Sequence, residues 1–293
     1  MALVWRTALP LCHTGSSSDA AITPLMDALF PLLALTATVL YFLAAIRVAR
    51  AVGAGRAPDR LATGSLALLG ALLHGAVLQH VLVQPAGLHF GLSTISTLHG
   101  WLIALLALLV NVWRPVQGIY LVALPLAGIE LCLGLAGHSP APAGKNLDAA
   151  LQGHVLLSLL AYGVLSIAAL QALLLRWQEA ALRRHRRGLL VALPALQIME
   201  GMLFELIALG LGLLTLAIVT GFFVLDDLFA QHVAHKTVFS LMAWLTFTTL
   251  LAGRRWRGWR GRTAVRITLT GFGLLLLGFV GSQLVLELLL ARA

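Results

Sequence analysis

The feature that most constrains this chain is a series of eight long apolar runs separated by short polar segments. A helix needs about 20 mostly apolar residues to cross the hydrocarbon core of a bilayer. The eight candidates are residues 28–48, 61–83, 92–113, 118–135, 152–175, 202–224, 237–251 and 267–290. The seventh reaches full length only if its helix begins near Phe229, which extends it to 229–251. The sequence therefore predicts an all-α, polytopic membrane helical bundle with about eight transmembrane helices.

The composition excludes an ordinary soluble enzyme. Of the 293 residues, 60% are hydrophobic and 11% are charged, whereas a soluble domain is about 25% charged. The two cysteines, Cys12 and Cys132, are too few for a disulfide framework, and no C-x-x-C-H motif of a c-type cytochrome occurs. No catalytic motif and no P-loop stand out in the sequence. We therefore expect a membrane protein that is not an enzyme.

The chain is expected to hold one integral membrane domain, residues 26–293, behind an N-terminal extension, residues 1–25. The extension has mixed polarity and contains a Gly-Ser-Ser-Ser stretch. Its apolar run is too brief for a signal peptide. Met26 stands directly before the first apolar run. We expect the extension to be disordered or to result from a misassigned start codon.

The basic residues predict how the bundle is oriented. Sixteen of the 20 Lys and Arg residues lie in the loops that follow the first, third, fifth and seventh apolar runs. Cytoplasmic loops of membrane proteins carry such an excess of Lys and Arg. We expect these loops in the cytoplasm of a bacterium, the bundle in the inner membrane and both termini in the periplasm. The net charge of +9 then reflects topology and contact with lipid, so no nucleic-acid partner is expected.

Histidines gather in the outer half of the predicted bundle. Of the ten, only His185 falls in a cytoplasmic loop. The nine others are His13, His74, His80, His89, His99, His138, His154, His232 and His235. An imidazole is costly in lipid unless it is paired or ligates a metal. The distribution favours a ligand site near the outer face.

Three interpretations of these histidines stay open. The first is a set of scattered interfacial side chains that hydrogen-bond to the backbone. The second is haem, whose iron is held by imidazoles from two facing helices; His154 and His235 suit it because both open a span at the same depth. The third is a small metal site, for which zinc is a suitable ion. Its donors would be Asp226, Asp227, His232 and His235.

Further candidates lie on other spans. His99, deeper on the third span, is the reserve haem ligand, and His80 and His232 are additional choices for the second ligand. Glu130 and Glu287 also fall within spans. An intramembrane carboxylate is a functional candidate, but we expect these two to be buried as neutral, hydrogen-bonded acids.

Four segments of the second half carry a family resemblance. The fifth run opens with His154 and continues with Ser158, Ala161 and Tyr162, and residues 235–244 read HKTVFSLMAW. Residues 257–262 read RGWRGR, and the last span contains Gly and Phe at 271–272 and 279–281. These segments are similar to the membrane cytochrome c assembly family, the CcmC, CcsA and HemX-like group. Within it the chain most resembles the HemX/YpjD-like inner-membrane branch.

The resemblance implies a protein that binds or handles haem near the periplasmic face, with other cytochrome c assembly proteins as partners. It implies His154 as an outer-face haem ligand. The family's Trp-rich motif is replaced here by GFFVLDDLFAQHVAHK at 221–236, so His232 and His235 are chosen from their position alone. The alternative functions are a permease component of a transporter, with the histidines as a proton or metal path, and a membrane metal-site protein.

Overall fold

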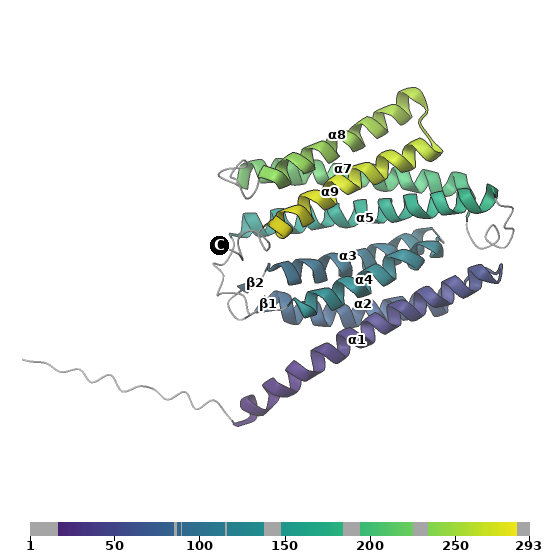
Figure 1. Cartoon of the computed structure of the whole chain (residues 1–293). Coiled ribbons are helices and arrows are strands. Elements are labelled where there is room, and N and C mark those ends of the chain that lie inside the picture. The colour runs from purple at the N-terminus through teal and green to yellow at the C-terminus, as the bar shows by residue number, and fades with distance from the viewer. Residues whose placement is uncertain are drawn as a thin grey trace, which may run out of the picture.

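The structure is a computed structural model that describes residues 17–84, 87–88, 90–114, 116–137, 148–183, 194–224 and 234–285. Eight long α-helices make up most of these ranges (Figure 1). They are α1 (Ser17–Gly53), α2 (Arg60–Leu82), α3 (Leu92–Trp113), α4 (Tyr120–Ala136), α5 (Ala149–Arg183), α7 (Leu196–Val224), α8 (Ala234–Arg257) and α9 (Gly261–Val285). A short 3-10 helix, η1 (Gln117–Ile119), precedes α4. Strands β1 (Val83–Gln84) and β2 (Gly87–Leu88) pair antiparallel between α2 and α3.

The predicted helical membrane fold is confirmed. Seven described helical segments are long and apolar enough to cross a membrane, and they correspond to the first seven predicted spans. The eighth predicted span, 267–290, begins inside α9 and runs beyond Val285, outside the described residues. The described part of α8 begins at Ala234, and the expected start near Phe229 also lies outside them.

Helix α1 differs from the expectation for the N-terminus. It begins at Ser17 and therefore reaches into the segment 1–25 that we expected to be a disordered extension. Residues 1–16 lie outside the described part of the chain. The division into an extension and a membrane domain stays a prediction.

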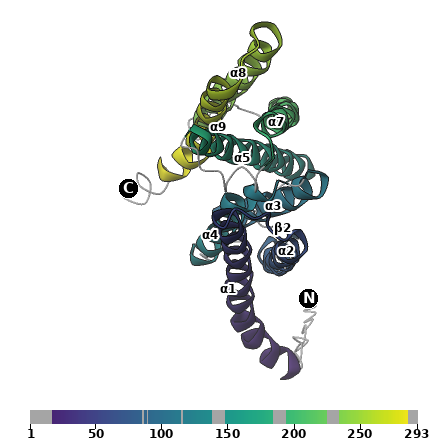
Figure 2. The same cartoon turned by 90° about the vertical axis from the view of Figure 1, so that its right-hand side faces the viewer.

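The helices form two groups that meet at α5 (Figure 2). In one group, α1, α2, α3 and α4 pack together; in the other, α5 packs on α7 and α9, and α8 packs on α7 and α9. Helix α5 also contacts α3, and 67% of its spanning window is buried. Small side chains such as Ala161, Ala168 and Ala172 are fully buried there, because close helix packing in a membrane favours small residues. Large apolar side chains point outward, as a lipid-facing surface requires.

The helices alternate in direction, so α1, α3, α5 and α8 all end at the right-hand end of the molecule in Figure 1. We call this the basic end, because the described arginines in the last turns of α1, α5 and α8, in the segments after α1, α3 and α8, and in the first turns of α2 and α9 accumulate there. They are Arg47, Arg50, Arg56, Arg60, Arg114, Arg176, Arg183, Arg254, Arg255, Arg257, Arg260, Arg262 and Arg266. Helices α3, α5 and α8 begin at the opposite end. Which side of the membrane the basic end faces stays a prediction.

The turn between α8 and α9 explains the sequence RGWRGR. Gly258 and Gly261 have φ angles of +66° and +53°, in the left-handed region that glycine adopts most readily. The Gly261 N–H donates to the Glu200 carboxylate at 3.1 Å, which places an acid at the positive end of α9. The Arg254 guanidinium lies 3.6 Å from the centre of the Phe204 ring. These contacts attach the turn to α7.

Candidate functional site

His154 is oriented by a hydrogen bond that crosses from α5 to α7. The half-buried imidazole lies near the start of α5, away from the basic end, and its Nδ1 is 3.0 Å from the Thr220 Oγ1. The Thr220 hydroxyl donates its single proton to the Ala217 carbonyl at 3.0 Å, so it accepts from the imidazole. This bonding pattern assigns the ring proton to Nδ1. Nε2 keeps a lone pair, which is the form in which a histidine binds a metal ion.

Gly221 lets this imidazole lie directly against α7. A Cβ atom at this position would be 2.9 Å from the His154 Cε1 and 3.6 Å from its Nε2. A side chain at 221 would therefore push the ring away from its place beside Thr220. Residue 221, which follows the hydrogen-bond partner Thr220, must therefore be small. The bond to Thr220 and the contact with Gly221 together fix the direction of the His154 ring.

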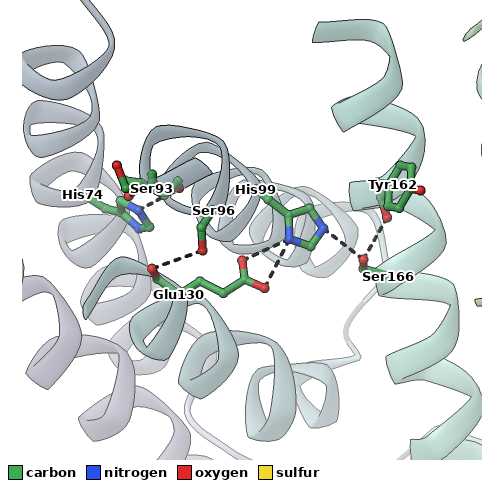
Figure 3. Close-up of polar contacts among 8 residues, drawn as sticks. His74, Ser93, Ser96, His99, Glu130, Tyr162 and Ser166 are labelled. Atoms are coloured by element: carbon green, nitrogen blue, oxygen red, sulfur yellow. Dashed lines mark hydrogen bonds and ion pairs between the residues drawn. The ribbon is translucent and has the colours of Figure 1, made fainter. Parts of the chain in front are cut away.

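A second polar cluster joins three helices (Figure 3). On α3, the His99 Nδ1 lies 3.0 and 3.2 Å from the two carboxylate oxygens of Glu130 on α4. The His99 Nε2 lies 3.1 Å from the Ser166 Oγ on α5. Ser166 donates its proton to the Tyr162 carbonyl at 2.8 Å, so Nε2 donates to Ser166. The side chains of His99 and Glu130 are only 14% and 17% exposed.

In this cluster, His99 and Glu130 are bonded to each other and to neighbouring groups of the bundle. The His99 Nδ1 is paired with the Glu130 carboxylate, and its Nε2 is bonded to the Ser166 hydroxyl. Both ring nitrogens are occupied, which makes His99 less suited than His154 to ligate a metal. Gly100 allows the pair to form, because a Cβ there would lie 3.0 Å from the Glu130 Cβ. The cluster therefore holds α3, α4 and α5 together.

His74 fits the interpretation of a satisfied core histidine. It is fully buried, and its Nε2 donates to the Thr97 carbonyl at 3.1 Å. The Tyr41 hydroxyl lies 3.3 Å from Nδ1 and donates to it. Both ring nitrogens of this histidine are used within the bundle.

The other predicted ligands do not share a described contact with His154. His80 is exposed and stacks on Phe30, with 3.6 Å between the ring centres. His235 is exposed at the first turn of α8, a helix that packs on α7 and α9. His232 lies outside the described residues, as do Asp226 and Asp227. Across the described ranges, no group of three or more His, Cys, Asp or Glu side chains is arranged to hold a metal ion.

Several contacts escape a search along the sequence. The Tyr162 hydroxyl donates to the Leu275 carbonyl at 3.1 Å, and the Trp244 indole donates to the Thr215 Oγ1 at 2.9 Å. Both residues stand in segments that carry the family resemblance, so the resemblance identifies these residues as candidates although it does not reveal their contacts. Thr220 and Gly221 carry no such signal, because threonine and glycine are frequent in membrane helices.

Comparison with known proteins identifies a family and several relatives. Residues 62–290 match the family described as cytochrome C assembly protein. Inner membrane protein YpjD of Escherichia coli (strain K12) is 37% identical over 136 residues, which cover 46% of this chain and 52% of that protein. The aligned part thus spans about half the length of that relative.

Two further relatives extend the similarity. An uncharacterized 28.8 kDa protein of Azospirillum brasilense is 29% identical over 218 residues, covering 71% of this chain and 80% of that protein. The cytochrome c biogenesis protein CcsA of Trichodesmium erythraeum is 29% identical over 90 residues, or 30% of this chain and 26% of that protein. No solved structure matches. With most of its length matched, this multi-pass membrane protein belongs to the cytochrome c assembly protein family.

Proposed function

We propose that this protein binds haem at the end of the bundle opposite the basic end and handles it in cytochrome c assembly. The observation that carries the proposal is the orientation of His154, whose Nδ1–H is held by Thr220. Histidines that ligate metals almost always donate their other N–H to a fixed acceptor. The family to which the chain belongs supports haem as the group concerned.

His235 is the proposed second ligand. Helices α5 and α8 begin at the same end of the bundle (Figure 1), and His235 stands exposed on the first turn of α8. His232 precedes it by three residues and is the nearest substitute in sequence. His99 and His80 rank lower, because their rings are engaged by Glu130 and Phe30. When bound, haem would supply the iron centre, and the residues of this chain would bind and orient it.

The remaining parts of the proposal follow from the family and the charges. We place the protein in a bacterial inner membrane, because its relative YpjD is named as an inner membrane protein. Its partners would be haem, membrane lipid and other cytochrome c assembly proteins. We expect no catalysed covalent step, because the sequence contains no recognised catalytic motif.

The absorption spectrum of the purified protein tests this function. A Soret band that persists through purification is the expected result. Bound zinc or copper without haem would contradict it and favour the small metal site. A protein with neither haem nor metal would also contradict it and favour a permease component. Because the readout is the spectrum of the protein, it needs no assumption about partners.

Reporter fusions test the orientation. A reporter that is active only in the periplasm should be on when it is fused within residues 139–144 or after Ala293. The same reporter should be off within residues 183–188 or 257–262, because the positive charges there hold these segments in the cytoplasm. The reverse pattern would contradict the orientation and place His154 on the cytoplasmic side.

Gly221→Ala tests the setting of His154 without altering a ligand. The added methyl group would overlap the His154 ring, so haem retained per protein should fall about tenfold or more, by analogy with the loss of an outer-shell partner. Gly212→Ala on the same helix is the matched control, because nothing lies within 4 Å of a Cβ at that position. Equal haem contents in the two variants would contradict the proposed role of the ring's position.

A further inference from the structure

A cavity of about 240 Å³ lies between the end of α5 and the start of α9, at the basic end. Its charged lining consists of Arg176, Glu179 and Arg183 from α5, and Arg262 and Arg266 from α9. Val265 also lines it and is buried. The two helices pack against each other (Figure 2). The arginines are therefore brought together by the fold and do not come from a single stretch of sequence.

The cavity carries an excess of positive charge. Glu179 is the single acid among its lining residues, and it forms an ion pair with Arg183. Throughout the described ranges, no carboxylate lies within ion-pair distance of Arg176, Arg262 or Arg266. Because its lining carries four arginines against one acid, the cavity favours an anionic ligand.

The chemistry of arginine narrows the class of anion. A guanidinium group presents five N–H donors in a planar fork that matches two oxygens of a phosphate. Several such groups around one cavity suit a phosphate-bearing ligand. Two sources can supply that chemistry, a phospholipid head group and a soluble phosphate.

The surroundings favour the phospholipid. The cavity lies where spanning helices end, which is the level of the head groups in a bilayer. On α5, Leu173 stands one turn before Arg176 on the same face and is 43% exposed. Leu173 thus places apolar surface beside the cavity, in the direction that acyl chains would take.

We propose that this cavity binds the phosphate of an anionic phospholipid, with Arg176 and Arg266 as its principal contacts. Basic pockets between transmembrane helices on the cytoplasmic side bind such head groups. The site is separate from His154, which lies near the other end of α5. Its test is therefore independent of whether the protein binds haem.

Lipid titration of the purified full-length protein in detergent tests the site. We expect phosphatidylglycerol and cardiolipin to raise the midpoint of thermal unfolding and to stay bound in native mass spectrometry, and phosphatidylcholine to do neither. The double variant Arg176→Gln/Arg266→Gln should bind the anionic lipids about 10- to 30-fold more weakly, at roughly 1 kcal/mol per arginine. Arg255→Gln/Arg257→Gln is the matched control, because it removes the same charge from exposed positions on α8.

Three results would overturn the proposal. Equal losses in the two double variants would show that lipid responds to general positive charge and not to the cavity. Equal stabilisation by inorganic phosphate would assign the site to a soluble anion. Full affinity in the cavity variant would remove the site altogether. If Arg176→Gln/Arg266→Gln does not fold, Arg176→Lys/Arg266→Lys keeps the charge but loses the planar fork, and unchanged affinity in that variant would equally exclude arginine-specific binding.

Discussion

A His154→Ala protein should lose most of its haem when it is purified beside the unchanged chain. Loss of an outer-shell partner alone weakens metal binding about 10–100-fold, and loss of the ligand itself should cost at least as much. The measurement is Soret absorbance per protein, with the amount of folded protein checked by elution from a sizing column. His185→Ala serves as the control, because the sequence places His185 in the basic segment after α5.

The companion variants separate the ligand from its support. Thr220→Val keeps the shape of the side chain but removes the acceptor for the His154 Nδ1–H, so haem binding should weaken about tenfold. His235→Ala should lose most of the haem if His235 is the second ligand. Full haem in His235→Ala would move the second ligand to His99, His80 or His232. Full haem in His154→Ala would contradict the assignment on which the proposed function rests.

The fold follows from local sequence because each span is a continuous apolar run. The predicted spans 61–83 and 92–113 correspond to Arg60–Leu82 and Leu92–Trp113. In a bilayer the backbone must satisfy its own hydrogen bonds, so such a run forms a helix whatever its neighbours are. Helix α5 extends beyond the apolar run that ends at 175, to Arg183. Beyond residue 175 the helix continues through charged residues, and these give a weaker signal in the sequence than an apolar run does.

The site is less predictable because it depends on the register between helices. His154 and Thr220 are 66 residues apart, and no local pattern announces their hydrogen bond. Glu130 and His99 each attract attention as ionisable groups within a span, yet their pairing depends on how α3 lies against α4. We expected Glu130 to be a buried, neutral acid with a hydrogen bond; its side chain is 17% exposed and bonded to His99, and its neutral form stays a prediction. Sequence reasoning identified the residue and missed its partner.

The pairing of Glu130 with His99 leads to the second large expected effect, which is a loss of stability when Glu130 is replaced. Glu130→Leu removes both acceptors of the His99 Nδ1 in a region that is largely shielded from water. Breaking one side of a buried ion pair costs on the order of 3 kcal/mol, because the remaining group is left unpaired. We therefore expect a clearly lower midpoint of thermal unfolding for Glu130→Leu in detergent. Glu205→Leu is the control, since its bond to Arg114 is exposed and such pairs contribute about 0–1 kcal/mol.

The double variant His99→Leu/Glu130→Leu decides whether the pair itself causes this loss. With both polar partners gone, no buried group is left unpaired, and Ser166 keeps its bond to the Tyr162 carbonyl. Replacing both partners by apolar groups of similar size is often nearly neutral. The double variant should therefore unfold at a higher temperature than Glu130→Leu alone. The single variant His99→Leu completes the comparison. If the loss in the double variant equals the sum of the losses in His99→Leu and Glu130→Leu, the two side chains are not coupled, and the cluster does not hold α3, α4 and α5 together.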